Sequence, residues 1–310
     1  MLQEKIRNLM AEATTAQAFR AHTPVGMQEP TVYIPTSAAR SALMCLSTDS
    51  LTGLFDKDGR LRRTPNAAPS SDEIRLDSVV IANSRVANAG AHIVIYPEAT
   101  KAHAVGKTGQ VALEHVPGHV RSIELAVFST VDVEEGGTVP TTPLPIQSSA
   151  IDWNLGVAKA VRFEISRSDR RKYSNPDELC AQVLATITLG LARAADEVLL
   201  SALSGMSLSP FTLGKAAAEG LMVGDLRALT SGAGAAIAHD GVLRASGVPA
   251  ELTADMAGTI AGAFNRASVV VKDDVTVMFE RIGNAGNLSV IAWASMLPIV
   301  NDPNKFWIVA

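Results

Sequence analysis

Several short motifs in this sequence contain the residue types of catalytic or ligand-binding sites, but their spacing does not fit the chemistry. Gly106-Lys107-Thr108 resembles the end of a phosphate-binding loop, yet Lys101 stands where that loop requires its first glycine. His115 and His119 have the spacing of a zinc-binding pair on one helical face. The Pro117-Gly118 step between them breaks a helix, so we expect both histidines in a solvated turn.

Two further motifs fail on the position of their glycines. In Asp56-Lys57-Asp58-Gly59 the glycine comes too early for a calcium-binding loop and the closing glutamate is missing, so a tight turn is expected. Gly232-Ala233-Gly234 lacks the third glycine of a dinucleotide-binding loop. Cys45 has no nucleophile signature, and Cys180 falls on a predicted helix, where a small buried role is expected. The sequence therefore predicts no enzyme, no metal site and no cofactor.

The composition narrows the function classes further. Of 310 residues, 47% are apolar and 19% charged, and 27 lysines and arginines against 31 acids give a net charge of −4. This apolar share supports a sizeable core and excludes wholesale disorder. The near-neutral balance argues against a dedicated nucleic-acid-binding domain. Residues 1–20 do not have the pattern of a signal peptide and no apolar run is long enough to span a bilayer, so we expect a soluble protein with no membrane partner.

The main concentration of positive charge lies just before a long predicted helix. It consists of Arg167, Arg170, Arg171 and Lys172. Two interpretations stay open for this basic cluster: a solvated entry to the helix, or a patch that faces phosphate groups without sequence specificity. No aromatic residues alternate with these charges, so stacking on nucleic-acid bases is not expected.

The long helix itself is the clearest predicted element. Asn175 is its N-cap residue, Pro176 occupies the first helical position, and Glu178 is placed for a capping box. Apolar residues follow at four-residue steps, and Gly205 is the expected stop. About 28 residues at about 1.5 Å each predict a helix roughly 40 Å long.

The chain before this helix divides into three parts. Residues 1–20 predict an amphipathic helix that docks on another element or subunit. From His22 to Ser71, repeated prolines predict an arm with one short helix at Ser37–Leu46. Strands follow, and then a Gly-Gly turn, a proline-rich spacer and a further strand-like run complete a long two-stranded excursion. These strand-like runs are Ser78–Ile81, His92–Tyr96, Gln110–His115, Ser122–Val133 and Ala150–Ile165.

The chain after the long helix is first glycine-rich and then strand-like. Residues 206–265 predict one helix, from Leu213 to Gly220 or Leu229, and looser chain after it. Valine- and isoleucine-rich runs then predict the closing strands. These strands are Ala267–Lys272, Val275–Ile282, Leu288–Ala294 and Phe306–Val309.

Five short motifs follow one another across residues 121–310. They are Val133-Glu134-Glu135-Gly136-Gly137 with its prolines, Ile165-Ser166 before the long helix, Gly241–Pro249, Ala261-Gly262-Ala263-Phe264 with the strands after it, and Asn301–Phe306. In this order the chain resembles the major capsid proteins of tailed bacteriophages, whose fold herpesvirus shells and encapsulins also use.

The resemblance implies an α+β chain with the HK97-like capsid fold: an N-terminal arm, an extended β-hairpin loop, a peripheral domain with a long spine helix, and a compact axial domain. The implied division is 1–75 for the N-terminal helix and arm, 76–120 for a strand-rich segment of uncertain placement, 121–165 for the extended loop, 166–205 and 266–310 for the peripheral domain, and 206–265 for the axial domain.

The same resemblance implies a major capsid protein that self-assembles into hexamers and pentamers of an icosahedral shell around double-stranded DNA. The virion capsid would be its location, after assembly in the host bacterial cytoplasm, and portal and scaffold or decoration proteins would be further partners. The basic cluster would face the non-specifically packaged DNA, and the extended-loop tip would contact a neighbouring subunit. That tip is Glu134, Glu135, Gly136 and Gly137. An encapsulin-like protein nanocompartment and, more remotely, an oligomeric α+β enzyme are the alternatives.

Two departures from the family pattern bear on these expectations. Some relatives cross-link their subunits through a lysine in the extended loop and a glutamate near the chain end. Here residues 136–147 contain no lysine and residues 288–298 no acid, so we expect a shell without isopeptide bonds. Residues 22–120 are longer than a plain arm, and we expect them to hold additional structure.

Overall fold

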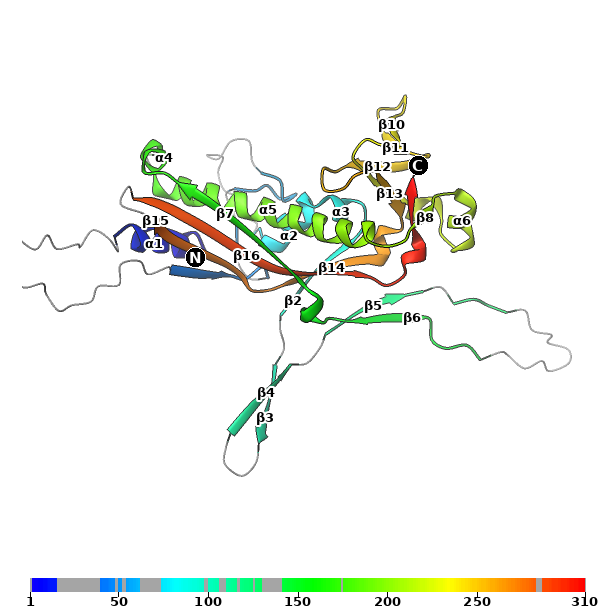
Figure 1. The fold of residues 1–310 in the computed structure, drawn as a ribbon, viewed down its shortest axis with the longest axis horizontal. Coiled ribbons are helices and arrows are strands. Elements are labelled where there is room, and N and C mark those ends of the chain that lie inside the picture. The colour runs from blue at the N-terminus through cyan, green and yellow to red at the C-terminus, as the bar shows by residue number, and fades with distance from the viewer. Residues whose placement is uncertain are drawn as a thin grey trace, which may run out of the picture.

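The structure is a computed structural model. It describes residues 2–15, 40–47, 50–51, 54–61, 74–97, 100–105, 110–115, 118–124, 126–129, 141–173, 175–282 and 286–309. Figure 1 shows an elongated plate in which the long helix α5 (Pro176–Ser204) lies along one sheet, a second sheet stands at one end, and two hairpins project outward. The predicted arm within residues 16–39 and the predicted loop tip at 134–137 lie outside the described residues.

Helix α5 confirms the clearest prediction from the sequence. It has 29 residues, which makes it about 43 Å long. Asn175 caps the first turn by accepting a hydrogen bond from the backbone N–H of Asp177 (2.9 Å), and Gly205 is the C-cap residue. Fifteen of its residues are buried, so it is covered on more than one face: strands β14 (Ala267–Lys272) and β16 (Asn287–Val300) and three shorter helices pack against it.

The larger sheet has six strands built around β16. One edge of β16 pairs with β15 (Val275–Ile282) and then with β14, and the other edge pairs with β7 (Val157–Ile165) over nine residues. Strand β1 (Arg40–Met44) pairs with β15, and β2 (His92–Tyr96) pairs in parallel with β14. The alternating buried residues Val275, Val277 and Phe279 confirm the predicted half-buried strand.

Helix α1 (Leu2–Thr15) packs on the plate of its own chain, where it contacts α5, β1 and β15. Its buried side chains are those of Leu2, Ile6, Met10 and Ala13. The prediction of a docked amphipathic helix is therefore confirmed, and the surface that receives it is intramolecular.

Two predicted elements near the N-terminus are wrong in type. The segment Ser78–Ile81, predicted as a strand, lies in helix α2 (Leu76–Asn83), and the predicted helix Ser37–Leu46 contains strand β1. In both places the tertiary surroundings override local preference. The apolar residues of α2 are buried where it meets α5, and β1 completes one edge of the large sheet. The short helix α3 (Arg85–Asn88) follows α2 and also contacts α5.

The smaller sheet has seven strands in the order β10-β11-β12-β9-β13-β17-β8. Their bounds are β8 Ser209–Pro210, β9 Arg227–Thr230, β10 Ala235–Ile237, β11 Leu243–Ala245, β12 Val248–Leu252, β13 Thr259–Gly262 and β17 Phe306–Val309. Helix α6 (Leu213–Ala218) and the 3₁₀ turn η2 (Val223–Asp225) lie in the same region. Where the sequence predicts loose chain after the helix, the structure has short strands. The last strand, β17, pairs with β13 and β8, although the implied division groups it with the peripheral domain.

Two hairpins leave the plate (Figure 1). The first consists of β3 (Thr100–Val105) and β4 (Gln110–His115), and the second of β5 (His119–Ile123) and β6 (Ile146–Ala150). The predicted run Ser122–Val133 is a strand only up to Ile123, and residues 126–129 are irregular. After β6 the chain passes through the turn η1 (Trp153–Leu155) into β7, which pairs with β16 rather than extending the hairpin.

Candidate functional site

The β5–β6 hairpin carries large apolar side chains that its own subunit leaves exposed. Phe128 is 96% exposed and Val127 86%, while Leu144 and Ile123 are exposed by 77% and 73%. Isolated exposed apolar residues are ordinary, but four on one slender projection form a surface that favours contact with another molecule. The described part of the chain places nothing over them, so a partner must bury them if they are buried at all.

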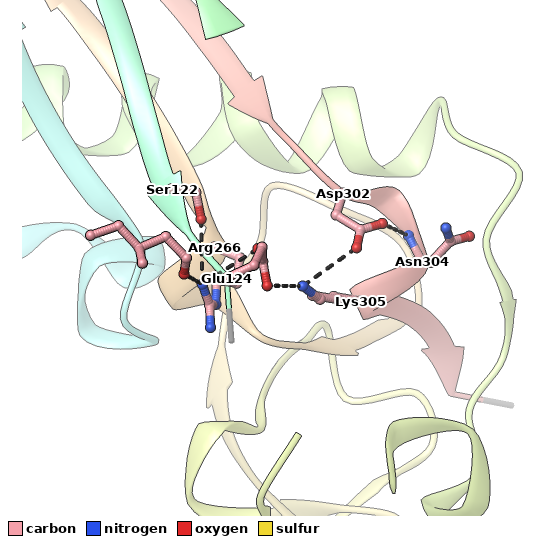
Figure 2. Close-up of polar contacts among 7 residues, drawn as sticks. Ser122, Glu124, Arg266, Asp302, Asn304 and Lys305 are labelled. Carbon is pink, nitrogen blue, oxygen red and sulfur yellow. Dashed lines mark hydrogen bonds and ion pairs between the residues drawn. The ribbon is translucent and has the colours of Figure 1, made fainter. Parts of the chain in front are cut away.

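A network of charged residues holds the base of this hairpin (Figure 2). Glu124, just after β5, forms ion pairs with Lys305 (2.6 Å) and Arg266 (3.4 Å). Arg266 belongs to the 3₁₀ turn η3 (Phe264–Arg266) and also donates to the carbonyl oxygen of Ile123. Lys305 belongs to η4 (Pro303–Lys305) and forms a second ion pair with Asp302 (3.4 Å).

The side chains of this network are largely buried, and this burial determines how much the ion pairs contribute to stability. The Lys305 side chain is only 7% exposed, and the other three are each about one-fifth exposed. Removing one partner from such a network leaves an uncompensated charge, at a cost of about 3 kcal/mol. The network therefore joins the end of β5 to the turns η3 and η4. Sequence reasoning missed it because Glu124 and Lys305 are 181 positions apart and no local pattern links them.

Helix α4 (Arg167–Lys172) carries the predicted basic cluster, and the structure divides that cluster in two. Arg170 turns toward α1, where its guanidinium donates to the Thr14 hydroxyl (3.1 Å) and to the carbonyl oxygen of Gly286. Arg281 donates to the Thr14 carbonyl oxygen (3.0 Å). The two guanidinium groups thus meet the carboxyl end of α1, where unpaired carbonyls favour positive charge. Burial, and then the charge of Arg281, lower the pKa of Arg170.

The remaining charges of the cluster are on the surface. Lys172 forms an ion pair with Asp169 (2.7 Å), and this hydrogen bond is the largest cause of the lowered pKa of the Asp169 carboxyl. Asp169 also accepts a hydrogen bond from Ser166, which caps α4. The Arg167 and Arg171 side chains are exposed, and no described residue pairs with either guanidinium. These two arginines are therefore the members of the cluster that remain free to bind an anion.

The buried acid Asp196 holds α3 against the long helix α5. Its carboxylate accepts hydrogen bonds from the Ser84 hydroxyl (2.6 Å) and from the backbone N–H groups of Arg85 and Val86 (3.0 Å each). Burial raises the pKa of Asp196, and these three hydrogen bonds partly offset that effect. From the sequence alone Asp196 is indistinguishable from a surface acid near a helix end, so its role was missed.

A shallow groove runs between α5 and β7. Its volume is about 290 Å³, and its walls are mostly apolar. They include Val161, Phe163, Ile187, Leu191 and Trp293. The outer edge of β7 carries no further strand in the described part of the chain, so its backbone groups are available for pairing.

The cysteine prediction is confirmed at Cys180. The residue is 1% exposed, and burial raises the pKa of its thiol to about 11, so it packs as a small apolar residue beside Met10. No helix in the described part of the chain combines the length and apolarity needed to cross a membrane.

Comparison with known proteins gives matches among solved structures alone. No family model matches the chain, and no curated protein does. Among the solved structures, the capsid of a native GTA particle is 12% identical, with 80% of this chain and 93% of that chain covered and a TM-score of 0.45. The satellite phage P4 procapsid with its size determination protein is 13% identical, covers 75% of this chain and 96% of its own, and has a TM-score of 0.45.

A virus-like particle from Pyrococcus furiosus is also among the matches. It is 10% identical, with 76% of this chain and 98% of that chain covered and a TM-score of 0.40. These three matches are a capsid, a procapsid and a virus-like particle, each at 13% sequence identity or less.

Proposed function

We propose that this protein is the major capsid protein of a tailed bacteriophage, a subunit that assembles in many copies into an icosahedral shell of hexamers and pentamers around double-stranded DNA. The observation that carries the proposal is the exposed apolar surface of the β5–β6 hairpin, above all Phe128 and Val127. A projection of this kind buries its apolar surface only against another molecule, and a repeated contact of that type builds a closed assembly.

The charge pattern around the hairpin supports contact between copies of the same chain. The hairpin, residues 119–150, contains four acids and one arginine, whereas residues 159–172 contain six basic residues and two acids. The opposite charges of these stretches favour a head-to-tail contact, in which the hairpin of one subunit meets β7 of the next, while Arg167 and Arg171 on α4 lie outside that contact. In the implied fold this hairpin would be the extended loop, and its tip, Glu134 to Gly137, would supply two of those acids to the contact.

The groove between α5 and β7 is the surface that best fits this hairpin. Val161 and Trp293 are 47% and 37% exposed at its mouth, so apolar area is available on both partners. Lys159, Arg193 and Glu197 also line the groove, where Lys159 is paired with Glu197 (2.7 Å) and Arg193 with Asp255 (3.0 Å), so the apolar contact and not charge would dominate. The free edge of β7 could pair with an extended segment of the neighbour, which adds backbone hydrogen bonds to the apolar contact.

The DNA-facing role is proposed for the exposed part of the basic cluster. Arg167 and Arg171 are available to bind phosphate groups. Lys172 forms an ion pair with Asp169, and Arg170 mainly holds α1 in place. Binding through so few charges would be weak and independent of sequence. This is compatible with a container in which DNA is enclosed rather than specifically bound. Portal and scaffold or decoration proteins, and assembly in the bacterial cytoplasm, belong to the same proposal.

Electron microscopy of the purified full-length chain, alone and co-expressed with the products of neighbouring genes, tests this function. Large hollow particles are expected, and particles that protect double-stranded DNA from nuclease would distinguish a capsid from a compartment with protein cargo. A chain that stays monomeric under every condition, or that forms only small oligomers with catalytic activity, would contradict the proposal.

A further inference from the structure

A polar pocket of about 330 Å³ lies at the base of the β5–β6 hairpin, where β5 leaves the plate beside β2 and β14 (Figure 1). The side chains that matter for its chemistry come from five separate segments. They are His92, Arg121, Asn265, Arg266, Ser268 and Asn301. The parallel pairing of β2 with β14 sets His92 directly beside Ser268, so the pocket floor is part of the rigid sheet.

The pocket contains hydrogen-bond donors for which the described residues supply no acceptor. Ser268 is only 7% exposed, yet no described residue accepts from its hydroxyl. The Ser268 hydroxyl lines the pocket and is therefore available to donate to a ligand there. The amide oxygen of Asn301 accepts a hydrogen bond from Ser149 (2.6 Å), which leaves its NH₂ group as the donor toward the pocket. Arg121 is exposed and has no ion-pair partner among the described residues.

The charge of the pocket is positive. None of the residues that line it is an acid. The nearest carboxylate, that of Glu124, is already engaged by Lys305 and Arg266, so Arg266 adds N–H donors without adding net charge. The unpaired charge is that of Arg121, with the His92 imidazole beside it. The pocket thus combines guanidinium, hydroxyl and amide donors and contains no competing carboxylate. A tetrahedral oxyanion requires such a set of donors.

We propose that this pocket binds a phosphate group, with Arg121 and Ser268 as its principal donors. The space holds one such group together with water, and the ligand would come either from free phosphate or from a nucleic-acid backbone. A bound phosphate would link β5 to β2, β14 and η3, so it would reinforce the attachment of the hairpin to the plate. This site is separate from the basic cluster on α4 and does not depend on how that cluster acts.

Isothermal titration of the full-length chain, in the assembly state in which it purifies, tests the site with inorganic phosphate against sodium chloride of equal ionic strength. Saturable binding of one phosphate per subunit is expected. Both Arg121→Gln and Ser268→Ala should weaken it at least tenfold. Arg244→Gln, which removes one arginine from the distant strand β11, should bind as the wild type does. Thermal melting in chloride verifies that all three variants are folded.

The titrations show whether the phosphate site exists. They also show whether its ligand is free phosphate or a nucleic-acid backbone. Absence of saturable phosphate binding, or equal binding by Arg121→Gln and Arg244→Gln, overturns the proposal. If a short DNA duplex displaces the phosphate from the wild type and binds Arg121→Gln more weakly, a nucleic-acid backbone is the ligand. If phosphate binds and DNA does not displace it, free phosphate is the ligand.

Discussion

Glu124 and Lys305 form a 2.6 Å ion pair at the point where the β5–β6 hairpin leaves the plate, with the lysine almost wholly buried. This contact joins the start of the hairpin to the turn that precedes the last strand. Because Arg266 and Asp302 complete the network, each charge has a counter-charge within 4 Å.

Replacing the buried cation should therefore destabilise the chain. In Lys305→Met, Glu124 keeps only its longer contact with Arg266 and Asp302 loses an ion pair. We expect the free energy of unfolding, measured by urea titration, to fall by about 3 kcal/mol. The double variant Glu124→Gln/Lys305→Met should recover part of that loss. A single Lys305→Met variant as stable as the wild type would show that the network contributes nothing.

The exposed hairpin residues should matter for assembly and not for folding. Phe128→Ser, at a side chain 96% exposed, should change the unfolding free energy of the isolated subunit by less than about 0.5 kcal/mol. The same substitution should reduce the yield of assembled particles, measured by light scattering, at least tenfold. Ser129→Ala, a change at the adjacent exposed position, is the matched control and should assemble normally. Normal particle yield from Phe128→Ser would remove the main support for a shell.

The two free arginines of the basic cluster should affect DNA content. We expect Arg167→Glu/Arg171→Glu particles to have a lower ratio of absorbance at 260 nm to that at 280 nm, because like charges repel phosphate groups. Empty-shell assembly should be unchanged. Lys5→Glu/Lys57→Glu, at two exposed positions, changes the net charge by the same amount and is the control for the charge change itself. Equal DNA content in the double variant and the wild type would argue against a DNA-facing cluster.

The pH dependence of stability should report on Asp196. Its pKa is raised in the folded state, so the folded chain holds this proton more tightly than the unfolded chain does. The contribution of this group is therefore fully present below its unfolded pKa, about 3.9, and is lost as pH rises through the folded value. The stability advantage of the wild type over Asp196→Asn should shrink as pH rises from about 4 to 7. If the difference in unfolding free energy between the wild type and Asp196→Asn, measured by urea titration, did not change with pH, burial would not be raising the pKa of the Asp196 carboxyl.

The absence of a cross-linking pair in the sequence is testable on a gel. Residues 136–147 contain no lysine and residues 288–298 no acid. Boiled and reduced particles should therefore give a single band near 32.5 kDa. A ladder of higher bands would show covalent bonds between subunits.

The elements that the sequence predicts correctly are those whose signals are local. The cap at Asn175, the proline after it and the stop at Gly205 define α5 from adjacent residues, and the alternation in Val275–Ile282 defines β15. Helix α2 and strand β1 are predicted wrongly because their types are decided by partners far away in the chain. The same limit applies to the pairs Asp196–Ser84 and Lys305–Glu124, whose members are more than 100 positions apart. In the basic cluster, the sequence predicts the charges but not that Arg170 is directed inward onto α1.

The position of strand β16 affects how the subunit transmits mechanical force. It pairs with three strands of the large sheet, and residues 301–305 then lead directly into β17 of the small sheet. Residues 263–266 likewise join β13 of the small sheet to β14 of the large sheet, so a force that pulls the two sheets apart is carried by at least two short covalent segments. Arg266 lies in one of these segments and Lys305 in the other, and both bind Glu124, so tension across the subunit would reach the base of the hairpin through both.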